Sequence, residues 1–272
     1  MRFSSNLVGF NVFNYFVRNA DNLLIGRFLG ATELGYYAMA YRLMLWPLHN
    51  ISGVVGRALF PVFSRYQADQ NRLVDAYVQV TAAIAFITAP LMFGFFVLRE
   101  PVIAVVLGER WQPVANILIW LAPLGFAQSI GATVGTLYLA TGRTDVMFKW
   151  GIGSGVFFIP IFAIGLQWGI TGVAAAYFLG SLLLFWPSLA IPYRLVGLQV
   201  SDVLLRLVPS IATAAVMAFV VAGLAILWPP NSSSQLLHLL LLILVGIVTY
   251  AGLTIMTQRP LLKNLIRAAF NR

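Results

Sequence analysis

Long stretches without a charged side chain constrain this chain more than any other feature of its sequence. No Asp, Glu, Lys or Arg occurs in residues 76–98, 111–142, 150–193 or 207–258. A helix needs roughly 20 apolar residues to cross about 30 Å of hydrocarbon. The first stretch therefore fits one crossing, the second fits one long crossing, and the last two fit two crossings each. The runs are continuously apolar, which excludes the alternating strands of a membrane β-barrel.

The composition supports a polytopic membrane protein of the all-α class. Charged residues make up 9% of the 272 residues and hydrophobic residues 60%, whereas about 25% of residues in soluble domains are charged. We expect a bundle of about eight transmembrane helices. The expected crossings are residues 7–29, 34–60, 76–98, 113–139, 147–165, 169–192, 203–227 and 236–256. Residues 57–75 form either an amphipathic surface helix or a helix end followed by a loop.

The basic residues indicate how the chain is oriented. The net charge is +9, but most Lys and Arg flank apolar runs, so we expect contact with membrane lipids and no nucleic-acid partner. Twelve of the 17 lie at helix ends and connectors that share one side of the membrane. Arg27, Arg99 and Arg110 lie on the opposite side, and Arg18 and Arg42 lie inside helices. The positive-inside rule then places both termini in the cytoplasm.

Polar residues share one face of the first predicted helix. Asn11, Asn14, Arg18 and Asp21 are spaced by three, four and three residues, which is the helical repeat. Ionisable residues within a membrane normally face a bundle interior or a water-filled cavity. Glycines four residues apart also recur and predict close helix packing. These pairs are Gly26 and Gly30, Gly131 and Gly135, and Gly151 and Gly155.

The second predicted helix adds Arg42 and His49, which are seven residues apart and so also share a face. Two interpretations remain open. In the first, Arg18 and Asp21 form a structural ion pair along their own helix, and the polar stripe only packs the bundle. In the second, the stripe lines a cavity for a charged group. Arg18 and Arg42 then bind phosphate oxygens.

We favour the cavity, because an ion pair alone does not require the further polar residues. Its candidate lining residues are Asn14, Arg18, Asp21, Arg42 and His49. Asp21 would then take up a proton or a sodium ion. His49 either titrates near neutral pH or is a structural, hydrogen-bonded residue.

The sequence contains little that indicates an enzyme. It has no cysteine, no phosphate-binding Gly-Lys-Ser/Thr loop and no His-Glu-x-x-His motif. The expected outward loops offer only Glu33, Glu100 and Glu109 as acids. We therefore expect no enzymatic activity, no cofactor and no metal site.

Several motifs in chain order resemble a known family. They are Asp21-Asn-Leu-Leu-Ile-Gly-Arg-Phe-Leu-Gly, continuing to Arg42, then Leu59-Phe-Pro-Val-Phe-Ser-Arg65, Pro90-Leu-Met-Phe-Gly94, Leu107-Gly-Glu-Arg-Trp111, Ala140-Thr-Gly-Arg-Thr-Asp145 and Trp168-Gly-Ile-Thr-Gly-Val-Ala174. Together they resemble bacterial polysaccharide flippases of the multidrug/oligosaccharidyl-lipid/polysaccharide exporter superfamily, most closely the colanic-acid exporters. The resemblance covers about residues 5–200.

The resemblance implies export of undecaprenyl-pyrophosphate-linked repeat units across the bacterial inner membrane, for exopolysaccharide or lipopolysaccharide synthesis. Members of the family work by alternating access: two six-helix lobes surround a central cationic cavity. The resemblance implies that Arg18 and Arg42 bind the pyrophosphate in this cavity. This chain matches one C-terminal lobe, residues 1–200, plus two trailing helices and a basic tail, residues 201–272. The missing lobe implies an internal start, a split or truncated gene, or assembly with a second chain.

Three alternatives remain at this point. The first is a multidrug or cation antiporter of the same superfamily. The expected membrane-embedded charges, two Arg and one Asp, disfavour it, because such proteins favour acidic cavities. The second is a membrane glycosyltransferase, polymerase or acyltransferase. The third is a truncated, inactive fragment or structural subunit.

Overall fold

The expected all-α fold is confirmed. The computed structural model describes residues 19–52, 70–229 and 235–258, and every element in these ranges is helical. The α-helices are α2 (Ala20–Phe28), α3 (Ala31–Pro47), α5 (Gln70–Val106), α6 (Gln112–Gly131), α7 (Val134–Ala140), α8 (Thr144–Gly165), α9 (Gly169–Leu195), α10 (Val200–Leu227) and α11 (Gln235–Thr257). Single turns extend three of them: η1 (Leu48–Ser52), η2 (Glu109–Trp111) and η3 (Leu166–Trp168).

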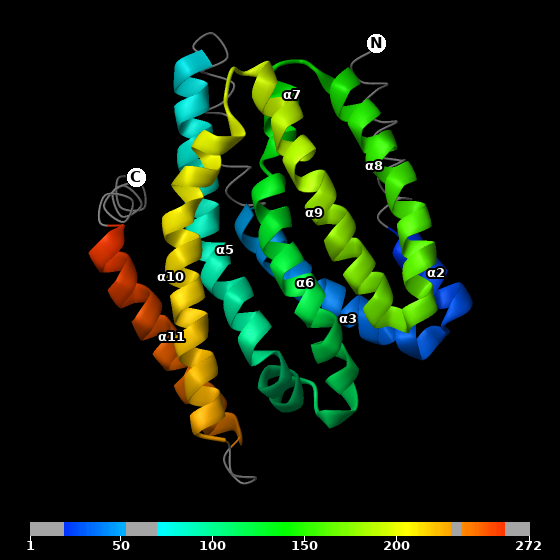
Figure 1. Ribbon diagram of the computed structural model, residues 1–272, viewed down its shortest axis with the longest axis vertical. Coiled ribbons are helices and arrows are strands. Elements are labelled where there is room, and N and C mark those ends of the chain that lie inside the picture. The colour runs from blue at the N-terminus through cyan, green and yellow to red at the C-terminus, as the bar shows by residue number, and fades with distance from the viewer. Residues whose placement is uncertain (1–18, 53–69, 230–234, 259–272) are drawn as a thin grey trace.

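The chain is a multi-pass membrane protein. Five helical stretches of the described residues are long and apolar enough to cross a membrane, and they are residues 71–106, 109–140, 144–195, 200–227 and 235–257. The third stretch holds α8 and α9, which fold back on each other as a hairpin (Figure 1). The helices α2 and α3 are not among the five, so the count of eight crossings stays a prediction.

Glycines separate most of the helices. Gly30, Gly108, Gly142, Gly169 and Gly197 have φ between 68° and 95°, a region that other residues rarely adopt. Gly169 shows the effect. It sits between η3 and α9 with φ of 68°, and the chain reverses there to form the α8–α9 hairpin (Figure 1). Glycines with positive φ thus allow the backbone to turn at five of the connections between these helical segments.

The helix α6 lies at the centre of the bundle. It packs against α5 on one side, against α9 on the other and against α3 behind (Figure 1). Gly125 permits the closest of these contacts. A Cβ at this position would lie 2.8 Å from Met92 Sδ and 2.9 Å from Met44 Cγ. The helices α10 and α11 pack on each other and on α5, where Tyr250 donates a hydrogen bond to the Phe86 carbonyl at 2.7 Å.

One detail of the sequence interpretation is corrected, and a second is tested only in part. The crossing expected at residues 76–98 belongs to a longer helix, α5, which continues through Arg99, Glu100 and Pro101 to Val106. Of the segment at residues 57–75, the last six residues begin α5, and the others lie outside the described residues.

The expected close packing is found at Gly26, where a Cβ would lie 3.1 Å from Leu34 Cδ2, but not at Gly30, Gly131 or Gly135. Gly30 lies between helices, and open space surrounds Gly131 and Gly135. The closest backbone approach of this kind instead joins Gly165 to Gly172 across the η3 turn.

Candidate functional site

Asp21 lies on the buried side of α2. Its side chain is 2% exposed. Ile25, one helical turn later, is buried on the same side of α2. This side faces α3, where Asp21 contacts Tyr37. The Tyr37 hydroxyl donates to Asp21 Oδ2 at 2.9 Å, and the Asn22 backbone N–H donates to Oδ1 at 2.8 Å. A buried carboxylate is costly unless such donors satisfy it. The contact therefore couples the short helix α2 to α3.

A line of aromatic rings extends from this pair into the bundle. Tyr37 stacks on Tyr41 with ring centroids 6.1 Å apart, and Tyr41 stacks on Tyr177 of α9 at 6.3 Å. Gln128 of α6 donates to the Tyr177 hydroxyl at 2.7 Å. Sequence reasoning did not single out Tyr37, Tyr177 or Gln128. The sequence feature that could have predicted this cluster is Gln128, a polar amide inside a long charge-free stretch.

Arg42 lies on a different face of α3 from Tyr37. Tyr37, Ala40 and Met44 are buried and point toward the bundle, since they follow the helical repeat. Four residues on the opposite side are exposed, namely Arg42, Trp46, His49 and Asn50. We call these four residues the α3 outer face. Arg42 and His49 do share a face, as their spacing predicted.

The structure thus separates the expected site residues. Asp21 is buried against Tyr37, whereas Arg42 and His49 are exposed on the α3 outer face. Asn14 and Arg18 lie outside the described residues. Within the part of the chain that the structure describes, Arg42 forms no ion pair.

The position of Arg42 along α3 makes its exposure informative. It follows the first residue of the helix, Ala31, by 11 positions, which is about 16 Å at 1.5 Å per residue. That distance is about half of a 30 Å hydrocarbon layer. In the crossing expected at residues 34–60, a cation at this depth would be unfavourable against lipid and would normally face water or protein. The α3 outer face therefore fits the wall of an aqueous cavity or an interface with further protein.

The backbone changes where the α3 outer face ends. Pro47 lacks the N–H that would bond to Leu43, and the chain continues as one π-helical turn, η1. Such turns often occur at functional sites. Asn50 Nδ2 donates to the Trp46 carbonyl at 2.8 Å. This bond caps a carbonyl next to the irregular turn and holds Asn50 beside Trp46.

Other polar clusters in the described residues are buried and bonded to one another. The Tyr77 hydroxyl lies 3.0 Å from Thr133 Oγ1 and 3.1 Å from the Tyr193 hydroxyl, and Thr88 Oγ1 lies 2.9 Å from Ser129 Oγ. All five residues are 5% exposed or less. They join α5 to α6 and α9, and their role is structural.

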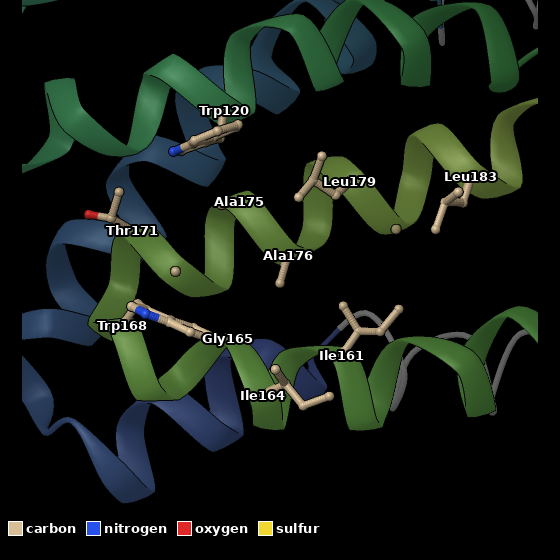
Figure 2. A pocket seen from close by; sticks show the side chains of 12 residues that line it. Trp120, Ile161, Ile164, Gly165, Trp168, Thr171, Ala175, Ala176, Leu179 and Leu183 are labelled. Carbon is tan, nitrogen blue, oxygen red and sulfur yellow. The ribbon is translucent and has the colours of Figure 1, made fainter.

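An apolar groove lies between α6, α8 and α9. Its volume is about 480 Å³. Trp120, Ile161, Trp168, Leu179 and Leu183 line it around a floor of small residues (Figure 2). None of its lining residues is charged, so it does not suit an anionic group. The α3 outer face is the better candidate for binding a phosphate.

One ion pair lies at a connection between helices. Arg143 Nε, just before α8, is 3.0 Å from Asp145 Oδ1, and both side chains are about half exposed. The hydrogen bonds that Arg143 donates to Asp145, together with the charge of that carboxylate, raise the pKa of Arg143. The pair is solvated and has no neighbour that suggests chemistry.

Several known proteins of polysaccharide biosynthesis are similar in sequence to this chain. A family described as polysaccharide biosynthesis protein matches residues 1–116. The lipopolysaccharide biosynthesis protein WzxC of Escherichia coli is 30% identical over 180 residues, which are 66% of this chain and 37% of that protein. The teichuronic acid biosynthesis protein TuaB of Bacillus subtilis is 33% identical over 135 residues, 50% of this chain and 28% of TuaB.

The chain is similar to proteins of polysaccharide biosynthesis and transport. A relative that matches almost its full length is the succinoglycan biosynthesis transport protein ExoT of Rhizobium meliloti, 27% identical over 276 residues. The match covers 98% of this chain and 54% of ExoT. These matches support the resemblance that the sequence motifs indicated.

A solved structure shares the fold. The lipid II flippase MurJ in its inward closed conformation superposes with a TM-score of 0.75 at 20% identity, over 92% of this chain and 52% of MurJ. This chain therefore spans about half the length of MurJ and ExoT, and less of WzxC and TuaB.

Proposed function

We propose that this chain is part of a transporter that moves lipid-linked oligosaccharide repeat units across the bacterial inner membrane. The export would serve exopolysaccharide or lipopolysaccharide synthesis. The observation that carries the proposal is Arg42, an exposed cation about halfway along a helix, in a relative of polysaccharide flippases. In this proposal Arg42 binds the pyrophosphate that links the lipid to the glycan, through charge-assisted hydrogen bonds.

The same proposal includes a two-lobed transporter. The matches extend over about half of ExoT and MurJ, which supports a second lobe supplied by more sequence or by a second chain. Residues 1–200 then form a six-helix lobe, and α10 and α11 are the first and second trailing helices. The second lobe faces the α3 outer face across the cavity, and Arg18 and Asn14 join its lining.

The described basic residues support the orientation in which both termini are cytoplasmic. One end of the bundle carries Arg72, Arg143, Lys149, Arg194 and Arg206, and the other carries Arg27, Arg99 and Arg110. The first end holds the α7–α8 and α9–α10 connections (Figure 1). By the positive-inside rule this end faces the cytoplasm.

The charge of the α3 outer face also argues against a drug antiporter. A carrier of cationic drugs needs acidic groups in its cavity. Asp21, the acidic residue of α2, is buried against Tyr37 and is not exposed beside Arg42, and none of the four residues of the α3 outer face is acidic. The described α3 outer face thus favours an anionic substrate.

Replacing Arg42 in cells tests the proposal. A strain lacking the gene is complemented with the wild type, Arg42→Ala, Arg42→Lys or Arg206→Ala, and both exported polymer and lipid-linked repeat units are measured. Losing a charge-assisted bond costs about 1.5–3 kcal/mol, or roughly 10- to 150-fold in affinity. We expect Arg42→Ala to lower export and accumulate lipid-linked units, and Arg42→Lys to restore part of the activity.

Arg206→Ala is the matched control, because Arg206 is an exposed arginine on α10, away from the α3 outer face. Equal amounts of each variant in the membrane are verified first. Normal export by Arg42→Ala, or an equal defect in Arg206→Ala, would contradict the assigned role of Arg42.

A further inference from the structure

Trp46 is a large exposed aromatic residue inside a polar face. It is 55% exposed and follows Arg42 by four residues. Their Cβ atoms are therefore about 6 Å apart on one side of α3. Tyr36, Tyr37 and Tyr41 of the same helix all contact other rings, whereas the Trp46 ring contacts none among the described residues. Its surface is therefore available to a ligand.

Anchoring at the lipid headgroups explains several tryptophans of this chain but not Trp46. Tryptophans collect where a helix leaves the membrane. Trp111 and Trp168 lie in the η2 and η3 turns, and Trp228 follows the end of α10. Trp46 is the second-last residue of α3, but six further residues continue the helical segment through η1 to Ser52, so Trp46 does not lie at the end of that segment.

Trp186 of α9 provides the contrast. It also lies within a continuous helical segment and is 57% exposed, but its exposed neighbours one turn before it are Leu182 and Leu183. An apolar surface of this kind fits lipid chains. Trp46 instead has Arg42 one turn before it and His49 and Asn50 one turn after it. Of these two exposed aromatic rings, the one with polar neighbours fits a ligand that is both charged and hydroxylated.

We propose that Trp46 is a sugar-binding platform, on which the first sugar of the lipid-linked glycan packs while Arg42 holds the adjoining pyrophosphate. This inference rests on the proposed function. The phosphate and that sugar are directly bonded, so their binding groups belong at neighbouring positions, as residues one helical turn apart are. The C–H groups on one face of a sugar ring carry partial positive charge and pack against the negative face of an indole. His49 and Asn50 then hydrogen-bond to sugar hydroxyls.

Trp46 would thus make the site selective for glycosylated lipid. Arg42 binds any lipid pyrophosphate, including the sugar-free carrier that returns after polymer synthesis. The indole adds affinity only when a sugar is attached. The two residues together discriminate cargo from empty carrier.

A binding experiment with two ligands tests this division of roles. The purified chain in lipid nanodiscs is titrated calorimetrically with farnesyl pyrophosphate and with the same pyrophosphate bearing one glucose. The variants are Trp46→Ala, Trp46→Phe, Arg42→Ala and the matched control Trp186→Ala. An aromatic contact of about 0.5–1.5 kcal/mol corresponds to roughly two- to tenfold in affinity.

We expect Trp46→Ala to weaken binding of the glucosylated ligand two- to tenfold and to leave the sugar-free ligand unchanged. Trp46→Phe should retain most of the affinity, Arg42→Ala should weaken both ligands, and Trp186→Ala should affect neither. Equal effects of Trp46→Ala on both ligands, or no effect on either, would overturn the platform. If Arg42→Ala weakens neither ligand, or the wild type binds neither, the pyrophosphate site in the proposed function fails as well.

Discussion

The contact between Gly165 and Gly172 gives a quantitative test of the packing. These residues flank the η3 turn of the α8–α9 hairpin. A Cβ at residue 172 would overlap the Gly165 carbonyl oxygen and lie 2.6 Å from Trp168 Cβ. Both obstacles are backbone or Cβ atoms, so no flexible side chain can move aside. Overpacking of this kind costs about 1–3 kcal/mol, and we take the upper end.

The expected effect of Gly172→Ala follows from two opposing contributions. Alanine gains about 1 kcal/mol over glycine in helix propensity, so the net loss is about 2 kcal/mol. Gly153→Ala is the matched control, because Gly153 lies in α8 of the same hairpin with no atom within 4 Å of a new Cβ. It should be neutral or stabilise the protein by up to about 1 kcal/mol. Reversible unfolding by dodecyl sulfate in mixed micelles, followed by tryptophan fluorescence, measures both variants. Equal stabilities of the two variants would refute the close packing.

Two further predictions concern buried hydrogen bonds. A double-mutant cycle of Asp21→Asn and Tyr37→Phe should show a coupling of about 1.5–3 kcal/mol in the same unfolding assay, because the Tyr37 hydroxyl donates to a buried carboxylate; additive effects would show that this bond contributes nothing. Tyr250→Phe, which removes only the hydroxyl that bonds to the Phe86 carbonyl, should cost about 1 kcal/mol and increase hydrogen exchange in α11 but not in α8. Unchanged exchange in α11 would mean that this bond does not hold the helix to α5.

Hydropathy predicted much of the helical arrangement, for physical reasons. Charge-free runs identify the segments that lipid can surround, and the length of the run at residues 150–193 correctly predicted two helices there. The extension of α5 through Arg99 and Glu100 could not be predicted in this way. A helix satisfies its own backbone whether lipid or water surrounds it, so the end of an apolar run need not be the end of a helix.

The candidate site was predictable only within each helix. The seven-residue spacing of Arg42 and His49 correctly predicted that they share a face. How α2 is rotated relative to α3 depends on tertiary packing, which brings Asp21 to Tyr37 and leaves Arg42 on the outside. For the same reason, pairs such as Gly131 and Gly135 suggested close packing that occurs instead at Gly165 and Gly172. These contacts join positions on different helices, which a periodic pattern in one helix does not specify.

The sidedness of the lipid-linked oligosaccharide tests the central claim most directly. Spheroplasts of the wild type and of a strain lacking the gene are labelled with a radioactive sugar and treated with a glycosidase that cannot enter the cell. The fraction of lipid-linked repeat units that the enzyme cleaves is then measured. We predict cleavage in the wild type, and in the deletion strain an equal or larger pool that is protected from the enzyme. The same cleaved fraction in both strains would contradict a role for this protein in moving the units across the membrane.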